Sequence, residues 1–120
     1  STFRVDGATL LAALENGVSQ VEEGGGRFPQ VSGMSFAFDA SADPGSRVSD
    51  VLIGGVPLDP AKTYGVVSNN YVRNGGDGYE MFKSAADAYD FGPDLAEVTA
   101  EYLIQNGPYT PFTDDRIVAK

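Results

Sequence analysis

Residues 71–79 read YVRNGGDGY, in which three glycines surround one carboxylate, Asp77, and a tyrosine stands at each end. Glycine tolerates backbone angles that other residues avoid, so such a loop can bring its backbone close to a flat ligand. Tyr71 and Tyr79 offer aromatic surface for stacking, and Asp77 offers two acceptor oxygens to hydroxyl groups. The stretch therefore predicts a site for an aromatic small molecule that carries hydroxyls.

A second stretch of similar character lies upstream, where residues 24–33 read GGGRFPQVSG. Three consecutive glycines predict a flexible loop, and Phe28 follows that loop as a further aromatic ring. We expect the two glycine-rich stretches to contribute to one ligand site.

The composition excludes several classes of function. The chain has 120 residues, which corresponds to one domain, and 17 acidic against 8 basic residues give it a net charge of −9. Nucleic acids and anionic membranes require clustered Lys and Arg, so we expect neither as a partner. Neither Cys nor His occurs, which excludes disulfides, thiol nucleophiles, Ser-His-Asp triads and His-based zinc sites. Carboxylates are the groups left for chemistry.

Hydrophobic periodicity predicts an α+β fold, a single domain with a mostly antiparallel sheet packed with helices. Alternating or β-branched runs predict strands over residues 3–5, 31–39, 47–53, 56–58, 63–68 and 116–118. Helical spacing predicts a helix over 8–16, a helical turn over 79–84 and a clearer helix over 94–106. Asp94 and Glu97 form a capping-box pattern at the start of the last helix. Its apolar stripe is expected in the core: Leu95, Val98, Tyr102 and Leu103.

Metal and phosphate motifs are alternative interpretations of the acidic and glycine-rich segments. An EF-hand register across the glycine loop would place Arg73 and Ser84 where acids are required, so calcium is not expected there. The pairs Asp87 with Asp90 and Asp114 with Asp115 could hold Mg²⁺ in principle, but solvated surface acids are the better interpretation. No Gly-Lys-Ser/Thr phosphate loop occurs. We expect no metal site and no catalytic residue in this chain.

Several motifs together resemble the C-terminal domain of the 5′-nucleotidases, a family that includes periplasmic UDP-sugar hydrolases and cell-surface ecto-5′-nucleotidases. The motifs are GRFPQVSG at 26–33, PGSRV at 44–48, Tyr64, and the segment from Asn70 to Tyr79 with its GGDG. Their order and spacing match the family from about residue 1 to residue 84. Beyond residue 84 the resemblance rests on a helix and a final strand.

The resemblance implies that the domain recognises the substrate, while an N-terminal metallophosphatase domain with two divalent metal ions hydrolyses it. It implies that Phe28 and Tyr71 sandwich the base and that Asp77 binds the ribose hydroxyls, with Gly75 and Gly76 completing the loop. Familiar members carry Phe where this chain has Tyr71, and a Tyr ring can still stack. The family's upstream Asn-Gly-Gly-Gly-(Ile/Val)-Arg segment is absent from the 120 residues.

The resulting expectation is that residues 1–120 form one such domain, truncated at its N-terminal side and inactive by itself. The parent would be a periplasmic or extracellular enzyme that hydrolyses nucleoside 5′-monophosphates. The expected partners are a nucleoside or nucleotide and the upstream domain of the same polypeptide, and the fragment could self-associate. The sequence leaves two alternatives open: a UDP-sugar, cyclic-nucleotide or sulfur-conjugate hydrolase, and a stand-alone nucleoside-binding or interaction module without catalysis.

Overall fold

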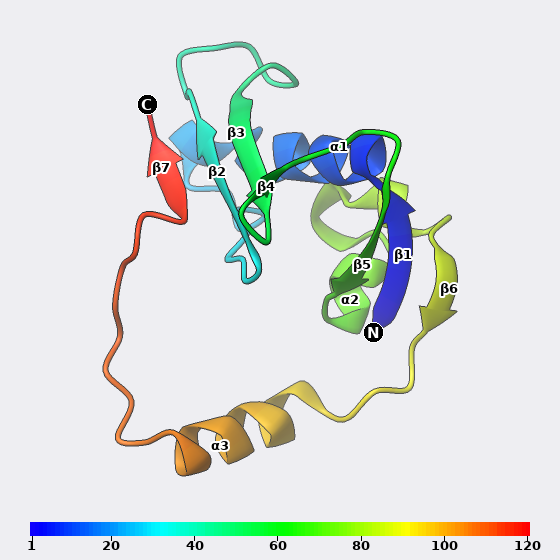
Figure 1. Cartoon of the computed structure of the whole chain (residues 1–120), viewed down its shortest axis with the longest axis vertical. Coiled ribbons are helices and arrows are strands. Elements are labelled where there is room, and N and C mark those ends of the chain that lie inside the picture. Colours follow the sequence, from blue (N-terminus) through cyan, green and yellow to red (C-terminus); the bar gives the residue numbers. More distant parts are fainter.

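Two β-sheets, bridged by one helix, organise the computed structural model, which describes residues 1–120 (Figure 1). The first sheet has the order β5-β1-β6 and consists of β1 (Thr2–Asp6), β5 (Thr63–Val67) and β6 (Ala86–Tyr89). The second has the order β4-β3-β2-β7 and consists of β2 (Met34–Phe38), β3 (Val48–Ile53), β4 (Val56–Pro57) and β7 (Ile117–Ala119). All strand pairs are antiparallel except β2 with β7. The predicted α+β class with mostly antiparallel pairing is confirmed.

Helix α1 (Gly7–Val18) joins the two sheets through their cores. It begins at Asp6, whose carboxylate accepts a hydrogen bond of 2.7 Å from the backbone N–H of Thr9, as expected of an N-cap. One core cluster contains Phe3, Val5, Leu10, Ala13, Tyr79 and Phe82, and the other contains Leu14, Val18, Phe36 and Phe38. Successive turns of α1 thus serve successive clusters, which fixes one sheet relative to the other.

Short helical turns replace the loop that the sequence predicted over residues 71–78. Helix α2 (Asn70–Arg73) begins at Asn69, whose side chain accepts from the backbone N–H of Val72 at 2.8 Å. Two 3₁₀ turns follow, η2 (Gly76–Gly78) and η3 (Glu80–Phe82), and another, η1 (Val21–Glu23), follows α1. The helical turn expected over 79–84 is therefore present, and Tyr71 lies within a helical turn.

Helix α3 (Leu95–Gln105) forms where the sequence predicted it, but its expected burial is wrong. Asp94 accepts from the backbone N–H of Glu97 at 3.1 Å and caps the helix, yet no residue of α3 is buried. Leu95 and Tyr102 of the apolar stripe are 61% and 56% exposed. The helix lies away from both sheets, between two extended connections (Figure 1). Periodicity identifies the apolar face of a helix but not a surface that covers it.

We call residues 1–82 the body and residues 83–120 the arm, because burial stops at Phe82. All 15 buried residues lie between Phe3 and Phe82. The radius of gyration is 14.8 Å, against about 13.6 Å expected for a compact domain of this length, and the open arm accounts for the excess. Strand β6 in the arm was not predicted, because its four residues, ADAY, contain no β-branched side chain and form too short a run to show a pattern; all four are exposed. No helix combines the length and apolar character needed to cross a membrane.

Candidate functional site

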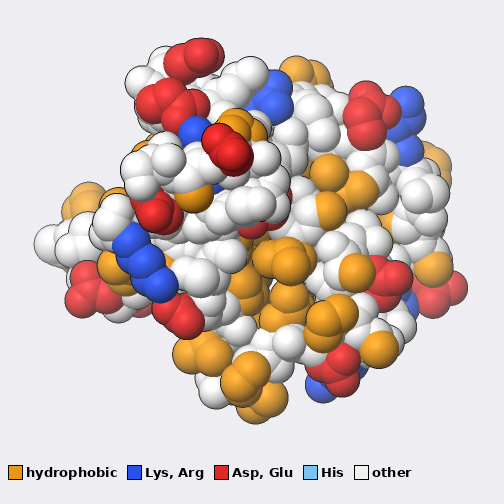
Figure 2. All heavy atoms as spheres, turned by 90° about the horizontal axis from the view of Figure 1, so that it is seen from above, with side chains coloured by type: hydrophobic (Ala, Val, Ile, Leu, Met, Phe, Trp, Pro, Cys, Tyr) orange, Lys and Arg blue, Asp and Glu red, His pale blue; other side chains and the backbone are white.

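A cavity of about 990 Å³ in the body is lined by both glycine-rich stretches. Phe28, Tyr71 and Asp77, the three side chains predicted to bind a ligand, all contribute to its wall. Gly75 and Gly76 are not among the lining residues and lie in the turn directly before Asp77. Most of the other lining side chains are apolar, as is usual for small-molecule sites, and hydrophobic side chains gather around a hollow on one face of the molecule (Figure 2).

Tyr71 and Asp77 form one side of this cavity. The Tyr71 ring is 59% exposed, and its hydroxyl lies 3.4 Å from Oδ1 of Asp77. A Cβ atom added at Gly76 would lie 2.5 Å from that ring, so the ring can rest on the backbone only because residue 76 is glycine. Asp77 has φ of 55°, a left-handed conformation that Asp tolerates better than most residues. The turn therefore presents an exposed ring and an exposed carboxylate together.

Phe28, on the other glycine-rich stretch, also lines this cavity and has a double role. It is half-buried, and its ring packs edge-on against Phe38 with centroids 5.7 Å apart and an interplanar angle of 71°. This contact ties it to the second core cluster, which explains why a ring on a glycine-rich loop keeps a fixed place. Its remaining surface lines the cavity. Phe28 thus contributes both to the core, through Phe38, and to the wall of the cavity.

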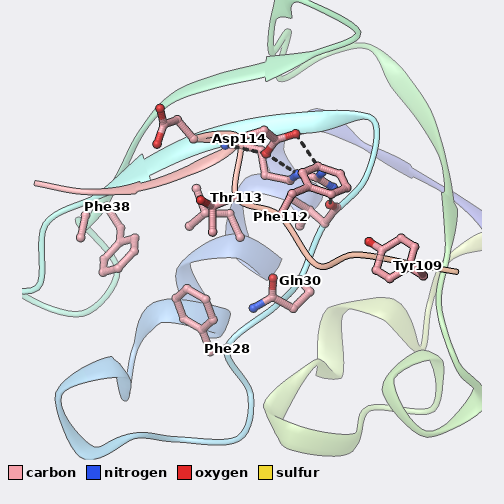
Figure 3. Close-up of a pocket in the computed structure, with 12 residues that line it drawn as sticks. Phe28, Gln30, Phe38, Tyr109, Phe112, Thr113 and Asp114 are labelled. Atoms are coloured by element: carbon pink, nitrogen blue, oxygen red, sulfur yellow. Dashed lines mark hydrogen bonds and ion pairs between the residues drawn. The ribbon is translucent and has the colours of Figure 1, made fainter.

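Phe28 also borders a second cavity of about 500 Å³, between the body and the end of the arm (Figure 3). There Arg116 donates to Asp114 at 2.7 and 2.8 Å and to the backbone carbonyl of Val31 at 2.9 Å. Its guanidinium also lies over the ring of Phe112, 5.5 Å from the centroid. The bonds from Arg116 hold the pKa of Asp114 below its usual value. This charged pair is thus satisfied internally, and it fastens the arm to the chain just before β2.

A chain of hydrogen bonds connects the two glycine-rich stretches that line the larger cavity. Nδ2 of Asn16 donates to the backbone carbonyl of Asp77 at 3.0 Å, and Oδ1 of Asn16 accepts from Nη1 of Arg27 at 2.9 Å. The Tyr79 hydroxyl donates to the carbonyl of Arg27 at 2.7 Å. Burial, and secondarily the charge of Asp77, raise the pKa of Tyr79 to about 12. The Tyr79 hydroxyl therefore keeps the proton that it donates to Arg27 to a higher pH than an exposed tyrosine would. Sequence reasoning missed the roles of Asn16 and Arg27.

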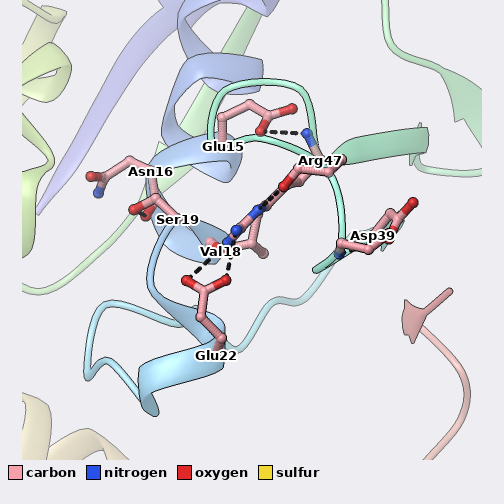
Figure 4. Close-up of polar contacts among 9 residues, drawn as sticks. Glu15, Asn16, Val18, Ser19, Glu22, Asp39 and Arg47 are labelled. Atoms are coloured by element: carbon pink, nitrogen blue, oxygen red, sulfur yellow. Dashed lines mark hydrogen bonds and ion pairs between the residues drawn. The ribbon is translucent and has the colours of Figure 1, made fainter.

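A buried arginine, Arg47, holds the chain segment that leads from α1 to Phe28 (Figure 4). Only 6% of Arg47 is exposed. Its guanidinium donates to the carbonyls of Val18 and Ala42, both at 2.8 Å, and to the Glu22 carboxylate at 2.6 Å. Glu15 accepts from the backbone N–H of Arg47 at 3.0 Å. The PGSRV motif was the signal for this residue, although periodicity alone gave it no role.

Two of the four acidic residues considered for a metal pair with arginines. Asp90 lies 3.6 Å from Nε of Arg73, and Asp114 pairs with Arg116. No group of three or more Asp and Glu side chains is arranged to hold a metal ion. The residues of this chain therefore do not fit a two-metal centre.

The geometry defines a class: an α+β domain whose two sheets are bridged by one helix and whose cavity carries aromatic rings and one acid. Residues 1–84 match the family described as "5'-nucleotidase, C-terminal domain". The chain belongs to this family of 5′-nucleotidase C-terminal domains.

Individual relatives agree with this membership. The chain is 39% identical to the trifunctional nucleotide phosphoesterase protein YfkN of Bacillus subtilis over 92% of its own length and 8% of the relative. It is 31% identical to the snake venom 5′-nucleotidase of Naja atra over 97% of its own length and 23% of the relative. Among solved structures, the 5′-nucleotidase precursor of Thermus thermophilus superposes with a TM-score of 0.91 at 44% identity, over 98% of this chain and 24% of that one. The chain spans less than a quarter of the length of each of these relatives.

Proposed function

We propose that this chain is the substrate-recognition part of a larger hydrolase that acts on nucleoside 5′-monophosphates. The observation that carries the proposal is that Phe28, Tyr71 and Asp77 line one cavity. Phe28 and Tyr71 hold the base by stacking, and Asp77 accepts hydrogen bonds from the ribose hydroxyls. Gly76 allows the Tyr71 ring its place, and Gly75 is part of the same turn. The family membership and the nucleotide-acting relatives support this assignment.

The hydrolytic step belongs outside this chain. In the proposed parent, an upstream domain of the same polypeptide holds two divalent metal ions, whose chemistry supplies an activated water. The residues of this chain contribute by binding the nucleoside and orienting the phosphate toward that domain, which lowers the entropic cost of reaching the reactive geometry. Purified protein of residues 1–120 is expected to release no phosphate from AMP in the presence of Mn²⁺, Co²⁺ or Zn²⁺.

Calorimetric titration with adenosine, uridine and AMP tests the proposal directly. Phe28→Ala and Tyr71→Ala should each weaken binding by about 1–3 kcal/mol, the range for base–aromatic stacking. Tyr71→Phe should change little, because the ring is kept. Phe91→Ala, which removes an exposed Phe of the arm, is the matched control and should leave affinity unchanged. Unchanged affinity in both Phe28→Ala and Tyr71→Ala would refute the assignment of the cavity.

The role of Asp77 has its own test. A hydrogen bond to an ionised acceptor contributes about 1.5–3 kcal/mol, so Asp77→Asn should weaken ribonucleosides more than the free base. An equal loss for adenosine and adenine would show that Asp77 only shapes the loop. Titration with UDP-glucose and a cyclic nucleotide in the same series distinguishes an AMP-type substrate from the alternatives. These alternatives are worth testing because the Bacillus relative is named a trifunctional nucleotide phosphoesterase.

The arm supports the expectation that the chain is truncated at its N-terminal side. Its exposed apolar side chains include Phe91 and Ile104, 84% and 81% exposed, and an upstream part of the parent is the proposed cover. In the isolated chain this exposed apolar surface favours self-association. The net charge of −9 opposes association, but its repulsion is screened beyond about 8 Å at 0.15 M salt. Sedimentation in about 0.15 M NaCl tests for self-association, and a clean monomer would contradict it.

The proposed compartment of the parent is periplasmic or extracellular, which the snake venom relative supports.

A further inference from the structure

Asn16 lies in the last turn of α1, between the two glycine-rich stretches, and both atoms of its amide are used. Oδ1 accepts from Nη1 of Arg27 at 2.9 Å, and Nδ2 donates to the carbonyl of Asp77 at 3.0 Å. The second contact joins residues 61 positions apart. A primary amide carries an acceptor and a donor on one carbon, so this side chain can hold two separate segments at once.

The packing around Asn16 leaves little room for another arrangement. A Cβ atom at Gly78 would lie 2.6 Å from Oδ1 of Asn16 and 3.0 Å from Nη1 of Arg27. A Cβ atom at Gly17 would lie 2.7 Å from Cδ of Pro29 and 2.9 Å from the Tyr79 hydroxyl. Both stretches are therefore pressed against one turn of α1, and the Asn16 hydrogen bonds lie at their meeting point.

The contacts of Asn16 lead directly to the ligand-binding side chains. Arg27 precedes Phe28, and it is held at its guanidinium by Asn16 and at its carbonyl by Tyr79. On the other side, Asn16 holds the backbone of Asp77, whose carboxylate lies 3.4 Å from the Tyr71 hydroxyl. Asn16 itself does not line the cavity. Any influence that it has on a ligand must pass through these neighbours.

We propose that Asn16 is a positioning residue: its amide sets the separation between the Phe28 side and the Tyr71–Asp77 side of the cavity. The inference rests on the proposed function for its effect on nucleoside binding, but the effect on the separation does not depend on any ligand. The two atoms of the Asn16 amide act on different sides. Oδ1 fixes the stacking side through Arg27, and Nδ2 fixes the ribose-binding side through Asp77.

The separation can be measured without a ligand, because the chain contains no cysteine and an introduced pair is labelled uniquely. Gly26→Cys, where a side chain meets open space, and Asn74→Cys, an exposed position beside Gly75, place spin labels on the two stretches. Pulsed electron–electron double resonance should give a narrow distance distribution in this pair. Adding Asn16→Leu or Asn16→Asp should broaden and shift that distribution, because both remove the donor to Asp77.

Two controls keep this experiment decisive. Asn106 also stands at the end of a helix, but its amide donates only to the carbonyl of Tyr102 in its own helix, so Asn106→Leu should leave the distribution unchanged. Asn16→Asp keeps an acceptor for Arg27 and should remain folded by circular dichroism even if Asn16→Leu does not. An unchanged distribution in a folded Asn16 variant overturns the proposal.

Nucleoside affinity provides the second readout. Asn16→Asp should weaken adenosine about tenfold, roughly 1.4 kcal/mol, and adenine much less, because the ribose side is released while the Arg27 contact is kept. Arg27→Met should weaken adenosine and adenine alike, because it releases the stacking side. Equal affinities of Asn16→Asp and the unsubstituted chain would overturn the inference. Failure of the unsubstituted chain to bind any nucleoside would sink the proposed function instead, while the spin-label distances would still decide the role of Asn16.

Discussion

Helices α1 and α3 begin in the same way and end up in different environments. Each starts at an aspartate whose carboxylate accepts from the backbone N–H three residues later, Asp6 for α1 and Asp94 for α3. Six residues of α1 are buried and none of α3. Local signals thus suffice to define a helix, whereas its burial depends on a second surface that only the body supplies.

The same division holds for the body and the arm as a whole. The arm contributes nine of the twelve large hydrophobic residues that are exposed: Tyr89, Phe91, Leu95, Tyr102, Leu103, Ile104, Tyr109, Phe112 and Val118. The family match ends at residue 84, close to the last buried residue, Phe82. The arm nevertheless keeps a defined place, because 98% of the chain superposes on the Thermus thermophilus structure. Within residues 1–120, however, the arm has no buried residue.

The largest expected effect contrasts two phenylalanines. Phe3 is 2% exposed and packs on Phe82 with ring centroids 4.9 Å apart, whereas Phe91 is 84% exposed. Phe3→Ala should lower the free energy of unfolding by about 3–5 kcal/mol, and Phe91→Ala by no more than about 0.5 kcal/mol. Urea denaturation followed by circular dichroism measures both. Similar losses for the two variants would break the division between body and arm.

A second contrast concerns two cations. Arg47 is buried and donates to two backbone carbonyls and Glu22, whereas Lys120, directly after β7, makes exposed contacts with Ser49 and Asp50. Arg47→Met should cost about 1.5–3 kcal/mol of unfolding free energy, since it removes charge-assisted hydrogen bonds from one buried and two part-buried acceptors. Lys120→Met should cost about 1 kcal/mol or less. A larger loss for Lys120→Met would show that β7 anchors the arm more strongly than its exposure indicates.

The alkaline limit of stability should depend on one tyrosine of the body. The pKa of Tyr79 is raised from 10.0 to about 12 by burial and by Asp77. The native state therefore keeps this proton where the unfolded state has released it, and the free energy of unfolding should fall as pH rises from about 10 to about 12. Tyr79→Phe should flatten that decline, although it also loses the bond to Arg27. Tyr102→Phe, in the exposed α3, is the control and should keep the slope; a slope unaffected by Tyr79→Phe would contradict the assignment.

The smallest effect on the free energy of unfolding is expected for a substitution in the exposed helix α3. Ile104 is 81% exposed, so Ile104→Ser should change the unfolding free energy by about 0.5 kcal/mol or less. The same substitution should shift sedimentation toward the monomer, because it removes apolar surface available for association. A loss above about 1 kcal/mol would mean that α3 packs on the body in solution.

Much of the secondary structure could be predicted from the sequence, and the reasons for the misses are physical. Helices α1 and α3 follow from periodicity and Asp caps, and β2 follows from the alternation of Met34, Phe36 and Phe38. Strand β6 is a run of only four exposed residues without a β-branched side chain, so little besides its backbone pairing with β1 marks it as a strand. The exposure of α3 could not be predicted, since amphipathicity identifies an apolar face without naming its cover.

The candidate site divides in the same manner. The glycine-rich stretches and their aromatic and acidic side chains were visible as local motifs, and the structure brings Phe28, Tyr71 and Asp77 to one cavity. Asn16 was not visible, because its importance comes from one contact across 61 positions that periodicity cannot encode. Arg47 reaches Val18 across 29 positions and belongs to the same category. The roles of residues that act through tertiary contacts can be identified only once the fold is known.

The parallel pairing of β7 with β2 has a consequence for the order in which the protein is made. Residues Phe36–Phe38 pair with Ile117–Ala119, so a ribosome completes β2 long before its partner exists. During that interval one edge of the nascent sheet offers unpaired N–H and C=O groups to other chains. Pairing with β7 covers this edge of β2 and makes β7 the outer strand of the sheet, so the β2 edge is exposed during synthesis until residues 117–119 have emerged.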